Sequence, residues 1–600
     1  METQTKKPRK IGILDILKSS YARHFIGKYK WSYLLGIAIL VFIDIEQTRV
    51  PLIVGNVIDG IKLGTMARSG ITRAVLSMFV IAAIVLAGRI LWRYFIFGAS
   101  RKIERDMRDD IYSHLQTLSA SWFQEHKAGE IMAHMTSDIE AVRMVFAVTV
   151  MMGMDSLAIG LSTIYKMLTK IDVRLTIVAI IPLFFVAVVT AVLGKEMHRR
   201  FTIRQEAFSR LSDFVQEKLG GMRVIKAFVQ EEQECASFEK VNYETRTANI
   251  RQAKMEAFMF PFMRMIAGIA MAVAIGYGGY IAILGRITVG GFSAFVQYLG
   301  MLVWPIAAIG RIINIITRGS ASMTRLEKLL DAPTDIHDAE DAPAVNQLDG
   351  SVEVRNLTFS YPGEPTPVLH GITLSVPKGS TLGIVGRTGA GKTTLVNLML
   401  RIFDPAEGSI FIGGCDVRHV PLHALRHTIG YVPQDNFLFS DTVSRNISFG
   451  NRSKTQADVE RAADLACVHD NIVGFAKGYS TTVGERGVSL SGGQKQRISI
   501  ARALILEPEI LIMDDSVSAV DTDTEEQILR HLAETRAGKT NIIIAHRIST
   551  LQHADQIIVL DGGTIAERGT HTELVEQNGI YADLYQRQLL EKKKEEEYAI

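Results

Sequence analysis

The sequence predicts an α-helical transmembrane domain with six spans, followed by an α/β domain built around a phosphate-binding loop (P-loop). Three observations lead to this fold class. Apolar residues gather before about residue 320, where six stretches are each long enough to cross a bilayer as a helix. Charged residues gather after that point. Residues 386–393 read Gly-Arg-Thr-Gly-Ala-Gly-Lys-Thr between an apolar run and a helix-favouring run, which is the pattern of a loop that cradles phosphates.

The composition excludes some classes of protein. A chain of 600 residues holds several folding units, since domains typically contain about 100–200 residues. The formal net charge of +3 provides no basic field, so no nucleic-acid partner is expected. The three cysteines, Cys235, Cys415 and Cys467, are widely spaced and form no metal or redox pattern, which suits a reducing cytosol. No small-residue cleavage site follows the basic N-terminus, so no removable signal peptide is expected.

The first 30 residues are rich in lysine and arginine. Within them Ile13, Leu14, Leu17 and Tyr21 recur at helical spacing. We expect a cytosolic amphipathic segment over 1–30 that lies on the inner leaflet, with its positive charge holding the N-terminus inside. A solvated tail is the alternative interpretation.

The six predicted spans make up a transmembrane domain over residues 31–330. They lie near residues 31–59, 72–98, 142–168, 173–194, 256–285 and 290–317. Each is long enough for a hydrocarbon core of about 30 Å. Six spans return the chain to the side where it began, so both termini and the second domain should face the cytosol, at the cell (plasma) membrane.

Two connections between the spans are long, and the others are short. The second and third spans are separated by residues 99–141, and the fourth and fifth by about 60 residues. Both connections are charged and helix-favouring, and both lie on the cytosolic side in this topology. We expect helices that continue out of the bilayer and turn back.

Five charged residues fall inside the first two spans: Asp44, Glu46, Arg49, Arg89 and Arg93. Ionisable residues within a membrane usually face a bundle interior or a water-filled cavity. Asp44 and Arg89 lie at similar depth, so we expect a contact between them, while Glu46 and Arg49 are one helical turn apart. A structural ion pair and a contact to a transported compound both remain open.

The phosphate-binding loop opens the chemistry of the second half. A polar, proline-bearing linker is expected over 331–349, and an alternating strand follows at 351–359. Glycines let the backbone approach a polyphosphate, and the N-terminus of the following helix favours its charge. Lys392 can reach the outer phosphates, and the Thr393 hydroxyl can bind Mg²⁺. The loop therefore predicts binding of a nucleoside triphosphate.

Six spans with two long cytosolic extensions, followed by a phosphate-binding domain, resemble the ATP-binding cassette (ABC) exporters of the bacterial multidrug or lipid type. The resemblance implies that the extension tips act as coupling helices, near residues 121–130 and 220–228. It also implies an ATP-binding cassette over 350–590, followed by a charged tail over 591–600.

The resemblance also assigns roles to single residues of the cassette. Tyr361 would stack on adenine, and Gln434 would contact both Mg²⁺ and the attacking water. Asp514, which ends the strand at 510–514, would lie on the Mg²⁺ side, and His546 would contact the γ-phosphate. Residues 481–487 match a loop found in exporters, and 518–521 a loop at the dimer interface. The expected nucleotide contacts of the chain's own site are Tyr361, Gly386, Arg387, Thr388, Gly389, Ala390, Gly391, Lys392, Thr393, Thr394, Gln434 and Asp514, with Thr393, Gln434 and Asp514 on the metal.

Residues 490–494, Leu-Ser-Gly-Gly-Gln, match the family signature. Through the resemblance, Ser491, Gly492, Gly493 and Gln494 would grip the γ-phosphate of a nucleotide held by a second subunit. One chain has one phosphate loop and one signature, and the two serve different sites. The working unit is therefore expected to be a dimer of half-transporters.

One residue departs from the family pattern. The family has a glutamate directly after Asp514 as general base, and this chain has Asp515. Aspartate is one methylene shorter, so its carboxylate would stand back by about 1 Å, which can cost about 100-fold in rate. We expect a hydrolysis-impaired site in a heterodimer whose partner carries the glutamate. A tolerated replacement in a homodimer is the alternative.

These features predict an ATP-hydrolysing translocase that exports hydrophobic or amphipathic, multidrug-type compounds by alternating access, with ATP and Mg²⁺ as cofactors. A lipid flippase or a peptide exporter working as a homodimer is an alternative. A nucleotide-gated regulatory or channel-like membrane protein is an alternative of another class. Six spans exclude a purely soluble ATPase.

Overall fold

The computed structural model describes residues 19–339, 345, 347–484 and 490–598. The chain divides into two compact units. The first comprises Met1–Leu115 and Ala128–Ala332, and the second Gln116–Lys127 and Pro333–Ile600. The amphipathic segment expected over 1–30 lies mostly outside the described residues, with Ile13, Leu14 and Leu17 among those left out.

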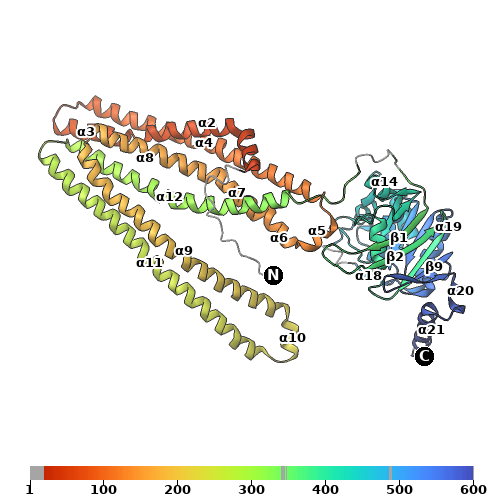
Figure 1. The fold of residues 1–600 in the computed structure, drawn as a ribbon. Helices are drawn as coiled ribbons and strands as arrows, with labels where there is room; N and C mark the ends of the chain where they lie inside the picture. Colours follow the sequence, from red (N-terminus) through yellow and green to blue (C-terminus); the bar gives the residue numbers. More distant parts are fainter. Residues whose placement is uncertain (1–18, 340–344, 346, 485–489, 599–600) are drawn as a thin grey trace. The chain divides into compact units, whose positions relative to one another are not determined.

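The first unit consists of helices (Figure 1). They are α2 (Ser20–Gln47), α3 (Val50–Lys62), α4 (Arg68–Leu115), α6 (Ala128–Ala133), α7 (Ile139–Met144), α8 (Val150–Lys170), α9 (Val173–Gly220), α10 (Met222–Ala227), α11 (Glu231–Ile283) and α12 (Val289–Leu330), with π-helical turns η1 (His134–Asp138) and η2 (Val145–Thr149). Within the described residues, four helical stretches are long and apolar enough to cross a membrane: Arg68–Leu115, Ala128–Lys170, Glu231–Ile283 and Val289–Leu330. The predicted spans at 31–59 and 173–194 fall on α2–α3 and on α9.

The first predicted span is not one helix, because α2 ends at Gln47 and α3 begins at Val50. Pro51 lies in the first turn of α3, where its missing N–H breaks no helical hydrogen bond. The Thr48 hydroxyl, at the break, donates to the Ile45 carbonyl over 2.7 Å. A continuous helix through this point would need the N–H that proline lacks.

The two long connections do continue the helices. Helix α9 has 48 residues and α11 has 53, against about 20 needed to span a bilayer. The two lie side by side and are joined by the short α10 (Figure 1). Helix α4 likewise runs on for 48 residues. The segment after it, which holds α5 (Ala120–Glu125), belongs to the second unit.

The second unit contains two sheets. One has the strand order β2-β1-β4-β5, formed by β1 (Val352–Phe359), β2 (Leu369–Val376), β4 (Ile410–Ile412) and β5 (Cys415–Asp416). The other has the order β10-β9-β3-β8-β7-β6, formed by β3 (Thr381–Gly386), β6 (Ile429–Val432), β7 (Ile510–Asp514), β8 (Thr540–Ile544), β9 (Gln556–Asp561) and β10 (Thr564–Gly569). Neighbouring strands from β9 to β6 pair in parallel. Every residue of β7 is buried, as is usual for parallel strands covered on both faces.

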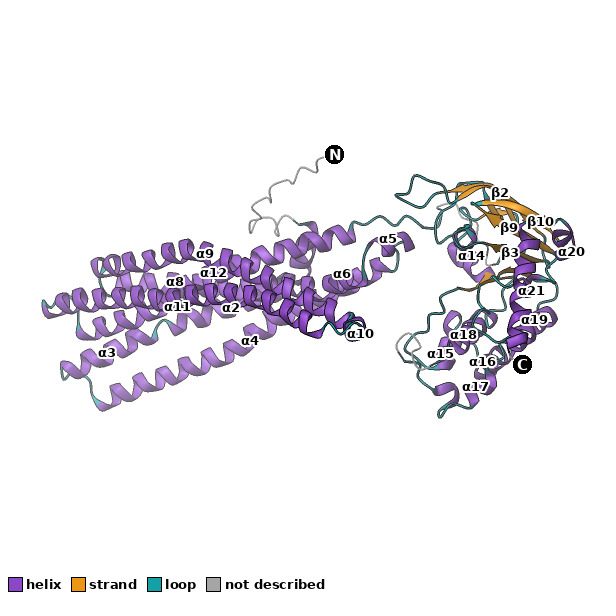
Figure 2. Cartoon of the chain, turned by 90° about the horizontal axis from the view of Figure 1, so that it is seen from below, coloured by secondary structure: helices purple, strands orange, loops and turns teal. Residues whose placement is uncertain are grey.

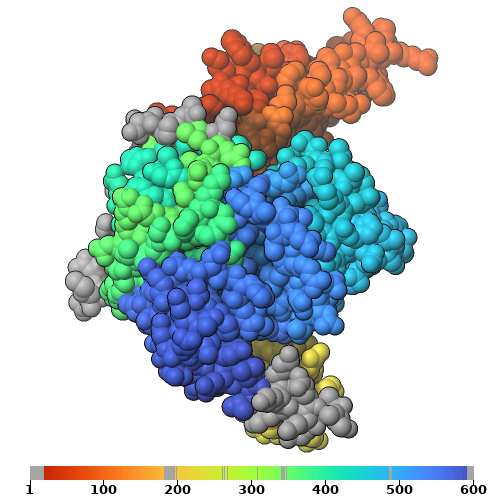
Figure 3. All heavy atoms as spheres, turned by 90° about the vertical axis from the view of Figure 1, so that its right-hand side faces the viewer, coloured from red at the N-terminus to blue at the C-terminus, as the bar shows by residue number. Residues whose placement is uncertain are grey.

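The helices of this unit form separate groups (Figure 2). Helices α13 (Lys392–Met399) and α14 (Leu422–Thr428) pack into the core between the sheets. A second core joins α15 (Val443–Ile447), α16 (Gln456–Leu465), α17 (His469–Val473), α18 (Gly492–Leu504) and α19 (Thr522–Thr535). Helices α20 (His571–Glu576) and α21 (Ile580–Tyr598) pack elsewhere. In Figure 3 the green residues of the first strands lie on the left of this unit, and the cyan residues of its helical part lie on the right. The predicted fold class, a helical domain followed by an α/β domain, is confirmed.

Candidate nucleotide-binding site

Four parallel strands end at the same edge of the larger sheet. Their register sets Val432 of β6 beside Met513 of β7, Asp514 beside Ile544 of β8, and Ile544 beside Ile384 of β3. A polar residue follows each of these strands within two positions: Arg387 after β3, Gln434 after β6, Asp515 after β7 and His546 after β8. The sheet therefore gathers the phosphate loop and the segments that carry Gln434, Asp515 and His546 at one edge, where α/β sheets bind their ligands.

The phosphate loop needs its glycines. A Cβ on Gly386 would lie 2.2 Å from the Leu560 carbonyl oxygen, which no side chain tolerates. Gly391 has a φ of 95° and caps the start of α13, a backbone conformation that glycine adopts without strain. Arg387, Thr388, Gly389 and Ala390 lie between these two glycines, so their backbone can wrap a phosphate group.

Lys392 folds back over the loop. Its Nζ donates to the carbonyl oxygens of Gly386 over 2.7 Å and of Arg387 over 3.0 Å. Burial lowers the pKa of Lys392, and the charges of Asp514 and Asp515 oppose that shift. The loop thus holds an ammonium group where a polyphosphate would need one.

Asp514 fits a hard metal ion. It closes β7, it is 2% exposed, and its Oδ2 has no hydrogen-bond partner among the described residues. Burial raises the pKa of Asp514, while a hydrogen bond with the Thr393 side chain opposes the rise. An orphaned buried carboxylate beside a hydroxyl and an ammonium provides oxygen ligands of the kind that Mg²⁺ prefers. These residues therefore fit a Mg²⁺-bound nucleotide.

Asp515 directly follows Asp514, and His546 comes two residues after Ile544, which pairs with Asp514 in the sheet. Asp515 has a φ of 47° and its N–H donates to the Ile544 carbonyl over 2.9 Å. Aspartate enters this left-handed region more readily than most residues with a side chain. His546 is exposed.

Two residues that sequence reasoning missed fasten the segment carrying His546. Gln588 of α21 donates from Nε2 to the His546 carbonyl over 2.6 Å and accepts from the Ile548 N–H over 2.9 Å. Glu525 of α19, 3% exposed, pairs with Arg547 over 2.9 Å and accepts a hydrogen bond from Thr550. Gln588 lies 42 positions from His546 along the chain, and no local pattern signals the contact. Glu525 lies in the first turn of α19. From the sequence it could be recognised only as an acidic residue that suits a helix N-terminus.

Tyr361 lies at the border of the core between the sheets. Its hydroxyl is 2.9 Å from the Thr394 hydroxyl, and its ring meets that of Phe403 edge to face at 5.1 Å. It lines a cavity of about 250 Å³ together with Ser121 and Glu125. Thr394 thus positions the Tyr361 ring in this structure.

Gln434 is exposed just past the end of β6. Its carbonyl oxygen accepts from the Asn436 side chain over 3.3 Å. It follows β6 by two residues, next to the end of β7 that carries Asp514. The predicted loop at 481–487 is described only as far as Gly484.

The signature residues start α18 with a capping box. The Ser491 hydroxyl accepts from the Gln494 N–H over 3.3 Å, and the Gln494 side chain accepts from the Ser491 N–H over 3.1 Å. Gly493 lies so close to Ala519 that a Cβ would meet the Ala519 carbonyl oxygen at 2.9 Å. Gly492 and Gly493 thus leave their N–H groups at an exposed helix N-terminus, beside the loop at 518–521.

Gln496 joins the signature helix to the residues after β7. Its Oε1 accepts from the Ala519 N–H over 2.9 Å, and its Nε2 lies 3.5 Å from the Asp515 carbonyl oxygen. The side chain is buried. Sequence reasoning missed this residue too, because a glutamine inside a helix carries no signal of its own.

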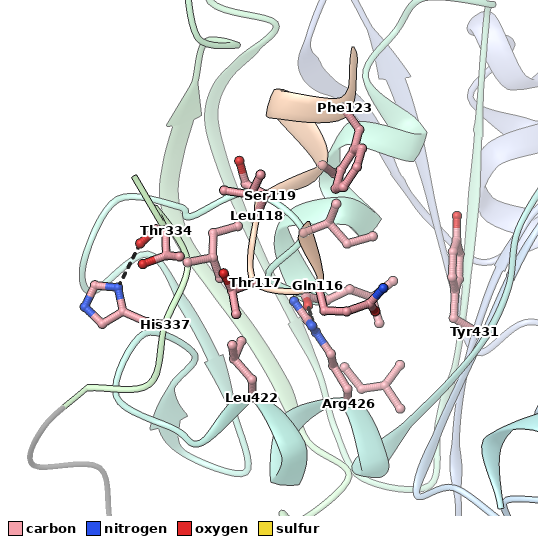
Figure 4. A pocket seen from close by; sticks show the side chains of 15 residues that line it. Gln116, Thr117, Leu118, Ser119, Phe123, Thr334, His337, Leu422, Arg426 and Tyr431 are labelled. Carbon is pink, nitrogen blue, oxygen red and sulfur yellow. Dashed lines mark hydrogen bonds between the residues drawn. The ribbon is translucent and has the colours of Figure 1, made fainter. Parts of the chain in front are cut away.

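The segment Gln116–Lys127 lies against the cassette around a cavity of about 840 Å³ (Figure 4). Leu118 and Phe123 line it from this segment, Arg426 lines it from α14, and Tyr431 lines it from β6. The Ser119 hydroxyl donates to Asp335 over 3.3 Å. The segment predicted at 121–130 is therefore two helices, α5 within this unit and α6 within the first.

The charges of the first unit pair differently from the prediction. Glu46 and Arg49 form the expected ion pair, at 3.2 Å. Among the described residues no ion pair joins Asp44 to Arg89, so that prediction is wrong. Arg89 donates instead to the Gln47 side chain over 3.1 Å, because Gln47, one turn further along α2, presents its oxygen to the guanidinium.

Known proteins share both halves of this chain. The model of the "ABC transporter transmembrane region" matches residues 33–306, and that of the "ABC transporter" matches residues 369–518. The probable multidrug resistance ABC transporter ATP-binding/permease protein YheI of Bacillus subtilis is 38% identical over 566 residues, covering 94% of this chain and 97% of that protein. The multidrug resistance-like ATP-binding protein MdlA of Escherichia coli is 39% identical over 559 residues, covering 93% and 94%.

A solved structure extends this similarity to three dimensions. The structure of a bacterial Atm1-family ABC exporter with ATP bound matches with a TM-score of 0.76 and 28% identity, covering 94% of this chain and 98% of that one. The match includes the helical domain and the cassette together. The chain therefore belongs to the ABC transporter family, as an ATP-hydrolysing membrane transporter of the exporter type.

Proposed function

We propose that this chain is one half of a dimeric exporter that uses ATP to move hydrophobic or amphipathic, multidrug-type compounds across the cell membrane by alternating access. The observation that carries the proposal is the convergence of Lys392, Thr393 and Asp514 at one sheet edge, in a chain that also holds long membrane helices. The names of YheI and MdlA, as multidrug resistance proteins, support the substrate class.

The residues at the sheet edge define how Mg²⁺ and ATP would be held. Lys392 would neutralise the outer phosphates, and Thr393, Asp514 and Gln434 would face the metal ion. Tyr361 would contribute an aromatic face for the adenine. ATP supplies the energy of the cycle through its hydrolysis, and the protein's part is to position the phosphates, the metal ion and the attacking water.

Two observations support a dimer. The phosphate loop belongs to the core around β3, whereas the signature starts a helix of the second core, so each would serve a different nucleotide in a head-to-tail pair. The tip of the second extension exposes apolar side chains: Val224 is 61%, Phe228 71% and Val229 80% exposed. A cassette of the second subunit is the partner that this tip fits.

We further propose that the partner is a different chain that carries a glutamate after its own strand-ending aspartate. Asp515 supports this, because its carboxylate stands back by about 1 Å from the position that a glutamate would reach. The intact signature at 490–494 would then complete the partner's active site. This chain's own site would bind nucleotide and hydrolyse it poorly.

In this proposal the cassette and both termini face the cytosol. Cys235 offers a direct test, because it is exposed on α11 in the second extension, whereas Cys415 and Cys467 are half-buried. A membrane-impermeant maleimide should label Cys235 in inverted membranes and not in intact cells. Labelling of Cys235 in intact cells would mean that the second extension faces the outside, which contradicts the proposed orientation.

Transport itself is tested with inside-out vesicles that contain the chain and its partner. A lipophilic dye should accumulate in the vesicles when MgATP is supplied outside, and vanadate should prevent the accumulation. A nucleotide-gated ion current without any accumulation would instead support the channel-like alternative.

A further inference from the structure

A small cavity lies between the segment Gln116–Lys127 and the cassette, beside Tyr361. Both of its walls belong to the second unit. Its volume is about 250 Å³, below the range of about 300–1,000 Å³ found for sites that hold a whole small molecule. It therefore suits one part of a ligand whose remainder is bound elsewhere. The cavity is lined from α5 by Ser121, Gln124 and Glu125, and from the cassette by Tyr361, Pro362 and Glu364.

The cassette wall of this cavity is fixed by its own contacts. The Glu364 N–H donates to the Tyr361 carbonyl over 3.0 Å, which closes a β-turn. Gly363 has a φ of 83°, as expected at the third position of a type II turn with proline at the second. The rings of Phe359 and Phe403 meet the Tyr361 ring edge to face at 5.2 and 5.1 Å. The turn and the neighbouring rings together hold the Tyr361 ring in place.

The same wall adjoins the phosphate loop. The Tyr361 hydroxyl lies 2.9 Å from the Thr394 hydroxyl. Thr394 comes two residues after Lys392, in the first turn of the helix that the loop begins. A ligand that places its phosphates on the loop thus has an aromatic ring beside the start of α13, on which a base can stack.

The α5 wall is attached by fewer contacts. The Ser119 hydroxyl lies 2.8 Å from the Ser121 hydroxyl and 3.3 Å from an Asp335 oxygen. Among the described residues, the side-chain hydrogen bonds of α5 stay within the segment. Leu118 and Phe123 line the larger cavity of about 840 Å³ (Figure 4), so the segment packs loosely there. Few fixed contacts are typical of a segment that opens locally at low cost in free energy.

The side chains of α5 match the edge of a base. Gln124 and Glu125 are exposed, and their amide and carboxylate, with the Ser121 hydroxyl, offer both donors and acceptors of hydrogen bonds. The edge of adenine also offers both, an amino group that donates and a ring nitrogen that accepts. A base stacked on Tyr361 would thus meet hydrogen-bonding groups on α5.

We propose that the base of the bound nucleotide lies between Tyr361 and α5, so that Ser121, Gln124 and Glu125 form part of the nucleotide site. This inference rests on the proposed binding of ATP and adds a second wall to the base end of that site. The base then links the segment Gln116–Lys127 to the cassette, whereas the phosphates contact the cassette alone. Nucleotide binding therefore restrains this segment through the base.

Hydrogen exchange of the full-length transporter in lipid nanodiscs tests the link. One sample contains Mg²⁺ and the non-hydrolysable nucleotide AMP-PNP, and another contains Mg²⁺ and inorganic triphosphate, which has no base. Both ligands should slow the exchange of peptides covering 386–393. Only AMP-PNP should slow exchange at 120–125, by about 2- to 10-fold for amides that one added hydrogen bond stabilises.

The affinities of both ligands, measured by calorimetry, show whether α5 touches the base. Gln124→Ala combined with Glu125→Ala should weaken AMP-PNP binding by about 2- to 10-fold and leave the binding of inorganic triphosphate unchanged. Ser121→Ala removes a single hydroxyl and should act in the same direction, which keeps the test open if the double variant does not fold. Glu232→Ala combined with Gln233→Ala is the matched control, because this exposed pair on α11 lies in the first unit. It should change neither affinity.

The outcomes separate this inference from the proposed function. If neither ligand slows exchange at 386–393, the proposed nucleotide site itself is wrong. If both ligands slow it there, and AMP-PNP has no greater effect than inorganic triphosphate at 120–125, the inference is wrong while the nucleotide site stands. Equal weakening of both ligands by the α5 variants would also overturn the inference, and so would wild-type affinity for AMP-PNP in these variants.

Discussion

Lys392 and Asp514 are charged side chains whose burial serves a ligand. Both are almost fully buried, and burial disfavours the charged form of each. Among the described residues neither group is neutralised by an ion pair, since Lys392 donates to loop carbonyls and one Asp514 oxygen has no hydrogen-bond partner. Stability given up at such positions is typical of binding sites.

Lys392→Ala should weaken nucleotide binding. Hydrogen bonds to charged groups contribute about 1.5–3 kcal/mol, so we expect about 10- to 100-fold lower affinity. Labelling with an azido-ATP analogue measures it on the full chain. Lys378→Ala is the control, because Lys378 is exposed and its ion pairs with described residues are long, 3.9–4.0 Å. Equal labelling of wild type and Lys392→Ala would contradict the site.

Asp514→Asn should stabilise the nucleotide-free protein at neutral pH. Burial raises the pKa of Asp514 above its ordinary value, so the folded state binds the proton more tightly and stability falls as pH rises above that value. The variant removes this loss, so its cassette should melt at a higher temperature than wild type at pH 7. The difference should shrink toward pH 4, and MgATP should no longer raise the melting temperature. A lower melting temperature for Asp514→Asn at pH 7 would contradict the assignment.

At the scale of elements, the site residues that could be predicted from the sequence lie at the ends of strands and the starts of helices. The apolar strand that ends at Asp514 was legible in the sequence, and so was the signature that begins α18. The contacts that could not be predicted from the sequence depend on packing between distant segments. Arg89 pairs with Gln47 rather than Asp44 because of how α2 and α4 pack, and Gln588 reaches the segment of His546 from a helix 42 positions further along the chain. The break between α2 and α3 did have a signal, Pro51, inside an otherwise apolar run.

Helix α21 should hold the segment that carries His546 through Gln588. Gln588→Ala removes the acceptor of the Ile548 N–H and the donor to the His546 carbonyl. A hydrogen bond contributes about 0.5–1.5 kcal/mol, so the amide of Ile548 should exchange its hydrogen about 2- to 10-fold faster. Hydrogen exchange with mass spectrometry on peptides covering 546–550 measures this. Arg587→Ala is the control, because it breaks an exposed ion pair with Asp583 on the same helix, and it should leave the exchange rate unchanged. Equal exchange rates in the two variants would contradict the proposed role of Gln588.

At the scale of the whole molecule, one chain has one phosphate loop and one signature. The phosphate loop follows β3 of the larger sheet, and the signature begins α18, a helix of the second core. Order along the chain predicted the domains and the motifs, because each motif is local. The partner was predicted only from the departure at Asp515, and no packing within one chain reveals whether the second subunit is identical.

ATP turnover by the purified chain alone, compared with turnover by the chain paired with its partner, tests the central claim. Asp515 should leave the chain alone with little hydrolysis, whether or not substrate is present. Turnover of the pair should be high, should vanish when the partner's glutamate is changed to glutamine, and should change little in Asp515→Asn. Full, substrate-stimulated hydrolysis by the purified chain alone would contradict the account.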